Sequence, residues 1–191
     1  MRSKTSFSIF AIIICILILV IYKYNYYNTN DNNSFFKENK QKTAQKLYNN
    51  ISSLDFKKEY PISPENVMKV QCDILMLLYG NMIQDDTLYS EILKIQRNLF
   101  SNELLENNSF ESQYSKFKEE IKNLDNNKIF CISIDYKPAV YNQYNNKYAT
   151  VEVDQVYSIL GKIKTSYNLE KKDIDNKWKI ASWEVIDSDL S

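Results

Sequence analysis

The chain has 191 residues, with 24 Lys and Arg against 24 Asp and Glu and no histidine. Without histidine it lacks the usual general base, the commonest metal ligand and the Ser-His or Cys-His nucleophile systems. The balanced charge also provides no basic face of the kind that nucleic acid needs, so we expect no metal, no cofactor and no nucleic-acid partner.

An uncharged apolar segment lies near the start of the chain. Residues 5–22 are mostly Ile, Leu, Val, Phe and Ala, and as a helix these 18 residues would reach ~27 Å, enough for a thin hydrocarbon core. Residues 23–27 offer no small-residue cleavage site, which favours a retained anchor over a cleaved signal peptide. Basic residues precede the segment, and only Lys23 follows it closely, so the N-terminus is expected in the cytoplasm.

The chain therefore divides into three parts. Residues 1–23 are expected to form a cytoplasmic stub and a single-pass membrane anchor. Residues 24–43 are polar and rich in Asn, which predicts a tether. Residues 44–191 are enough for one hydrophobic core and are expected to form an extracytoplasmic domain at the cell membrane.

Two cysteines fall in this domain. Cys72 lies in an expected helix and Cys131 in an expected strand, each beside apolar neighbours. A disulfide is permitted outside the cytoplasm, whereas an unpaired Cys is commonly a small buried hydrophobe. The sequence leaves both alternatives open and favours two buried thiols.

Apolar periodicity predicts helices in the first half of the domain. A short amphipathic helix is expected over 44–54. Ser63 and Pro64 are suited to the N-cap and first position of a helix that is apolar around most of its girth and should be buried. Further helices are expected after Asp85, as a short turn at 101–105, and over 109–124.

The period changes from helix to strand at residues 125–127. Phe130, Ile132, Ile134 and Tyr136 alternate with more polar residues, so the even positions should face a core. Further strands are expected at about 150–159, 163–169 and 178–186, with turns at Asn145-Asn146 and Gly161. Helices followed by antiparallel strands predict an α+β fold.

This order, closed by an aromatic strand at 176–183, resembles the nuclear-transport-factor-two-like (cystatin-like cone) superfamily. More narrowly, the chain resembles an uncharacterised family of bacterial single-span proteins. The features they share are a Tyr-Pro-x-[Ser/Thr]-Pro helix start at 60–64, a segment like 99–107 and a final Trp-Lys-Ile strand. The likeness covers about residues 50–187 and implies helices packed on a curved, cone-shaped sheet.

The resemblance also implies where a site would lie. Enzymes of this superfamily, such as ketosteroid isomerase and scytalone dehydratase, work inside the cone with an Asp or His base. Here Asp135 and Asp154 lie opposite the apolar alternation and are expected to face solvent, so no catalytic residue is assigned. Aromatic residues of the sheet are ordinarily core; those that are candidates for lining a ligand pocket are Tyr136, Tyr157, Tyr167, Trp178 and Trp183.

Two classes of function remain. The first is a non-catalytic, membrane-tethered binding or assembly module with a protein partner in the cell envelope, which predicts a filled cone and an exposed apolar patch. The alternative is an enzyme or small-ligand receptor, which predicts a polar group with a perturbed pKa inside an apolar cavity. A cleaved, secreted domain would require that the apolar segment is removed.

Overall fold

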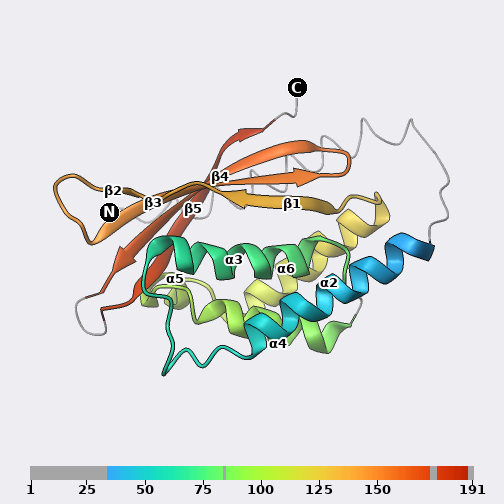
Figure 1. Cartoon of the computed structure of the whole chain (residues 1–191), viewed down its shortest axis with the longest axis horizontal. Helices are drawn as coiled ribbons and strands as arrows, with labels where there is room; N and C mark the ends of the chain where they lie inside the picture. The colour runs from blue at the N-terminus through green and yellow to red at the C-terminus, as the bar shows by residue number, and fades with distance from the viewer. Residues whose placement is uncertain (1–33, 84, 173–175, 189–191) are drawn as a thin grey trace.

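The structure, a computed structural model, describes residues 34–83, 85–172 and 176–188 (Figure 1). Helices lie on one side of a curved antiparallel sheet, so the α+β prediction is confirmed. The predicted anchor, residues 1–23, lies outside the described residues. Within the described ranges, no helix combines the length and apolar character needed to span a bilayer.

The helices begin where local capping chemistry places them. The side chains of Ser63, Asp85 and Ser109 accept hydrogen bonds from backbone amides of the first turn that follows each of them, which satisfies donors that a helix start leaves unpaired. The first described helix begins at Ser34, earlier than expected, and so takes in part of the predicted tether. The helices are α2 (Ser34–Ser52), α3 (Pro64–Tyr79), α4 (Asp86–Arg97), α5 (Asn102–Glu106) and α6 (Phe110–Asn126).

α3 is the central helix. It packs against the sheet on one side and against α2 and α4 on the other, and its apolar side chains are buried around most of the girth. Met68, Ile74 and Leu77 have no exposed surface. The predicted burial of this helix is therefore confirmed, and the one long polar side chain buried on it, Gln71, must find its partners inside the protein.

The sheet is a meander with one short additional strand. Within the described residues the strands pair in the order β1-β3-β4-β5, and β2 pairs with β3. Gly161 adopts φ 73° in the turn between β3 and β4, a conformation that glycine allows at little cost. The strands are β1 (Cys131–Tyr136), β2 (Val140–Tyr141), β3 (Tyr148–Tyr157), β4 (Gly161–Lys171) and β5 (Trp178–Ser188).

The predicted alternation of β1 is wrong at its start. Cys131 pairs with Tyr157 and Ser133 with Val156, so Ile132 is an extra residue, a β-bulge. The bulge reverses the alternation: Cys131 is 1% exposed, whereas Ile132 is 53% exposed. Beyond the bulge, Ile134 packs against the core, as the sequence predicts.

The two faces of the sheet differ in character. The face toward the helices carries apolar core residues, among them Val151 and Val153, each 0% exposed. The opposite face carries ion pairs, such as Lys137 with Glu152 at 2.6 Å and Lys162 with Asp154 at 3.5 Å. The inner face is therefore where a buried site has to be sought.

The two described cysteines are unbridged. Cys72 and Cys131 are both buried, and burial raises the pKa of each thiol to about 12. At neutral pH both are protonated, so they serve as small core residues rather than as nucleophiles.

Candidate functional site

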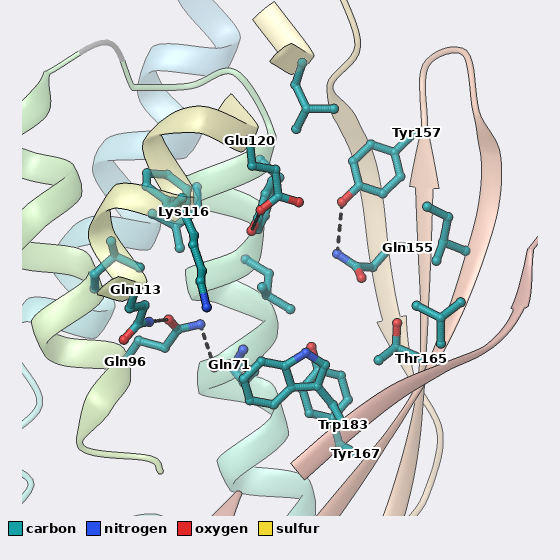
Figure 2. A pocket seen from close by; sticks show the side chains of 18 of the residues that line it. Gln71, Gln96, Gln113, Lys116, Glu120, Gln155, Tyr157, Thr165, Tyr167 and Trp183 are labelled. Atoms are coloured by element: carbon teal, nitrogen blue, oxygen red, sulfur yellow. Dashed lines mark hydrogen bonds between the residues drawn. The ribbon is translucent and has the colours of Figure 1, made fainter. Parts of the chain in front are cut away.

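A cavity lies between the helical layer and the inner face of the sheet. Its volume is about 160 Å³, and most of its lining is apolar (Figure 2). An engineered cavity of about 150 Å³ in another protein holds benzene, whereas drug-sized pockets run from about 300 to 1,000 Å³. The cavity therefore fits a molecule the size of one ring. Its half-buried lining residues come mainly from α6 and β5, so we place the entrance between these two elements.

The polar part of one wall comes from a single face of α6. Gln113, Lys116 and Glu120 recur at intervals of three and four residues, which places them one above the other on a helix. Phe117 and Leu124 extend the same face with apolar surface. Ser109, by capping α6, fixes where this face begins.

Glu120 is the most strongly perturbed acid of the cavity. Burial raises its pKa from the ordinary 4.5 to about 7, and a hydrogen bond from Tyr79 counteracts part of that increase. The Tyr79 hydroxyl donates to Glu120 Oε2 at 3.0 Å. A carboxyl with such a pKa changes between acid and carboxylate near neutral pH, so it can donate or accept a proton within the cavity.

The substitution Tyr79→Phe should raise the pKa of Glu120 above about 7, because the lost hydrogen bond favoured the carboxylate. The ring and its edge-on contact with Phe117 remain, so we expect little loss of packing. The measurement is an NMR titration of the Glu120 side-chain carboxyl carbon. A fall in the pKa on removal of the hydroxyl would contradict the assignment of Tyr79 as the donor.

A chain of glutamine side chains crosses from α6 to α3. Arg97 Nη1 donates to Gln113 Oε1 at 3.0 Å, Gln113 Nε2 to Gln96 Oε1 at 2.9 Å, and Gln96 Nε2 to Gln71 Oε1 at 3.3 Å. The Gln71 side chain acts to lower the pKa of the Tyr167 hydroxyl, against the larger increase that burial causes. All three glutamines line the cavity. In Figure 2 the glutamine chain ends beside the aromatic side chains of Tyr167 and Trp183.

Two tyrosines of the sheet face the cavity. Burial raises the pKa values of Tyr157 and Tyr167, so both hydroxyls stay protonated at neutral pH. Gln155 Nε2 donates to the Tyr157 hydroxyl at 3.3 Å. Tyr167 stacks on Trp183, with 6.1 Å between the ring centroids. The site thus combines aromatic surface with a few fixed polar groups.

The structure brings together three of the five aromatic residues that the sequence suggests for a pocket. Tyr157, Tyr167 and Trp183 line the cavity. Trp178 is 4% exposed and lies in the core away from the cavity, with its carbonyl bound to the Tyr60 hydroxyl. Tyr136 is 38% exposed, on the edge strand. Whether the three lining residues bind a ligand stays a prediction.

Sequence reasoning missed the polar residues of the site. Gln71 and Gln96 fall on helical faces that are otherwise apolar, and Glu120 lies next to the apolar stripe of α6. A polar side chain that interrupts a buried stripe is the signal that could have identified Gln71 and Gln96. The acids weighed for a site, Asp135 and Asp154, lie on the opposite face of the sheet.

The polar groups of the site are suited to proton exchange and hydrogen bonding. In the part of the chain that is described, no three His, Cys, Asp or Glu side chains are grouped so that they could hold a metal ion. The polar groups of the cavity include the Glu120 carboxyl, the tyrosine hydroxyls, the glutamine amides and the Lys116 ammonium. These groups can orient a small molecule in an apolar enclosure.

Comparison with known proteins gives a family without an assigned activity. A family model described as "Domain of unknown function (DUF6715)" matches residues 1–183. No curated protein and no solved structure matches the chain.

Proposed function

Because the chain belongs to the DUF6715 family, whose function is unassigned, we propose that it is a membrane-anchored, extracytoplasmic binding module that holds a small molecule between its helices and its sheet. The observation that carries the proposal is Glu120, a carboxyl with a pKa of about 7 inside a mostly apolar cavity. Burying such a group costs stability, and a cost of this kind is typical of functional sites. A pure assembly module would have a filled interior.

The superfamily resemblance supports the same proposal. We infer that the domain is a nuclear-transport-factor-two-like cone, since its helices cover the inner face of a curved antiparallel sheet and enclose a cavity there. A cone of this kind provides a pocket without fixing its chemistry. Here Glu120, on a helix, occupies the pocket, and the strand acids Asp135 and Asp154 do not.

The membrane part of the proposal rests on residues 5–22 and their flanking charges, and the family match includes this segment. We expect a C-terminally tagged full-length chain to stay in the membrane fraction after carbonate extraction. The tag should be digested by protease added to spheroplasts. A mature chain that begins after Lys23, or a tag protected from protease, would overturn this part.

Fluorobenzene tests the cavity directly. Added to the full-length chain in lipid nanodiscs, it should give a ¹⁹F signal of bound probe that empty nanodiscs lack, because the cavity fits one ring. Thr165→Phe should abolish the signal by filling the inner face, since Thr165 lines the cavity. The matched control is Lys164→Phe, which adds the same ring to the outer face, where Lys164 pairs with Asp187. Equal binding by both variants would contradict the site.

A second candidate function is the docking of a protein partner on the β2–β3 hairpin. Val140, Tyr144 and Tyr148 are 72%, 89% and 50% exposed, which forms an apolar patch at one end of the molecule. The patch lies at the opposite end of the domain from the start of α2 (Figure 1). Loss of a crosslinked partner on Tyr144→Ser, with fluorobenzene binding intact, would support docking here.

A further inference from the structure

Arg97 fixes the direction of the glutamine chain. A guanidinium only donates hydrogen bonds, so Gln113 has to turn its oxygen toward Arg97 and its nitrogen toward Gln96. Gln96 then turns its nitrogen toward the Gln71 oxygen. Each amide is thereby held in one orientation, and the chain ends at the cavity in the Gln71 nitrogen, which is a donor.

This end of the chain determines what Tyr167 can offer. The Gln71 oxygen is bound to Gln96, so the group that Gln71 can direct at the Tyr167 hydroxyl is its amide nitrogen, and this interaction acts to lower the pKa of Tyr167. Lys116, an ammonium with three donors and no acceptor, extends from α6 toward the same glutamines (Figure 2). Gln71 and Tyr167 therefore form a donor side of the cavity.

The opposite part of the cavity has a different character. There Glu120 accepts from Tyr79, and apolar side chains such as Leu124 and Leu160 complete the wall. A ligand that fills the cavity thus meets apolar surface over most of its area and hydrogen-bond donors at one end. A ligand that supplies an acceptor to the Gln71 amide nitrogen in this apolar enclosure therefore gains relative to one that does not.

We propose that the ligand is a single-ring molecule that carries a carbonyl or carboxylate oxygen, and that this oxygen is bound on the donor side, where Arg97 and Gln113 act as positioning residues through the glutamine chain. The inference rests on the proposed small-molecule function of the cavity. The competing explanation is that the chain only satisfies buried amides, in which case its direction has no effect on binding.

Four probes of similar size separate these explanations. Acetophenone and benzoate carry acceptor oxygens, isopropylbenzene has nearly the shape of acetophenone without a polar atom, and N-methylaniline carries one N–H donor. Binding to the full-length chain in nanodiscs is measured by NMR titration at fixed pH, with empty nanodiscs as the blank. We expect acetophenone to bind about tenfold more tightly than isopropylbenzene, as one or two net hydrogen bonds would give. If benzoate binds more tightly than acetophenone, the acceptor group of the ligand is a carboxylate. If acetophenone binds more tightly, the acceptor group is a ketone or an aldehyde.

Gln113→Glu reverses the direction of the chain without replacing any residue at its cavity end. A carboxylate at 113 accepts from Arg97 and also from Gln96, so Gln96 has to turn its oxygen toward Gln71. Gln71 then donates to Gln96 and turns its own oxygen toward Tyr167, which makes the donor side an acceptor. The preference for acetophenone should disappear and N-methylaniline should bind more tightly than acetophenone. Gln113→Leu, which breaks the chain without reversing it, should reduce the preference without inverting it.

The outcomes are distinguishable. Isopropylbenzene contains no polar atom, so its binding reports in each variant whether the cavity is intact. If none of the four probes binds the wild-type chain, the proposed small-molecule function fails, and this inference fails with it. If isopropylbenzene binds as tightly as acetophenone, or if Gln113→Glu leaves the order of the probes unchanged, the cavity stands as a binding site and only the acceptor inference is overturned.

Discussion

Replacing Glu120 by Gln should stabilise the protein by about 3 kcal/mol at pH 8 and leave it nearly unchanged at pH 4. Burial raises the pKa of Glu120 from 4.5 to about 7, and each unit of pKa corresponds to about 1.4 kcal/mol. Between these two values the folded protein holds a proton that the unfolded chain has released. The free energy of unfolding of the wild type therefore falls as the pH rises through this window.

A glutamine at position 120 is neutral at every pH and can still accept the hydrogen bond from Tyr79. Urea unfolding at several pH values, followed by the fluorescence of the two tryptophans, measures the difference between variant and wild type. Because the other titrating groups are the same in both proteins, the pH dependence of this difference reports the ionisation of Glu120. The matched control is Glu119→Gln, on the exposed face of the same helix. Its curve of unfolding free energy against pH should run parallel to that of the wild type. A Glu120→Gln curve that also runs parallel would show that the carboxyl is not desolvated.

The two tryptophans should respond differently to truncation. Trp178→Ala should cost about 3–5 kcal/mol, since this ring is 4% exposed in the core, where Tyr141 packs edge-on against it. Trp183→Ala should cost less than half as much, because Trp183 is half-buried at the cavity. It should also enlarge the cavity, so that molecules larger than one ring enter.

Thermal unfolding by circular dichroism and binding of naphthalene test this pair. Each variant is the control for the other, as both remove the same side chain from β5. We expect only the Trp183→Ala protein to bind naphthalene. An equal loss of stability in the two variants would mean that Trp183 is core and that the cavity wall lies elsewhere.

Local chemistry explains why the helices could be predicted. Ser63 with Pro64, Asp85 and Ser109 each cap a helix through contacts within a few residues, so the signal is present in a short window of sequence. The bulge at Ile132 could not be predicted, because it depends on which residues of β3 lie opposite. An apolar residue in an alternating segment predicts burial, and only the pairing shows that Ile132 lies outside.

The candidate site was predictable only in outline. Curvature of the sheet creates the cavity, and curvature follows from the packing of the whole domain. Tyr157, Tyr167 and Trp183 could be proposed because they are aromatic residues of the sheet. Trp178 is a tryptophan of the same strand as Trp183, yet it faces a filled core. Glu120 could not be distinguished from a surface acid, because the groups that desolvate it come from α3 and the sheet.

The bulge in β1 has a consequence for how this protein meets others. An exposed edge strand invites a strand from another chain, and irregular edges prevent such growth. β1 is interrupted twice, by Ile132 within it and by Pro138 after it, so a second polypeptide finds no continuous row of amides there. On the far edge, the segment around Phe100 already pairs with Ile180 of β5. An incoming strand thus meets an irregular edge at β1 and an occupied position at Ile180 of β5.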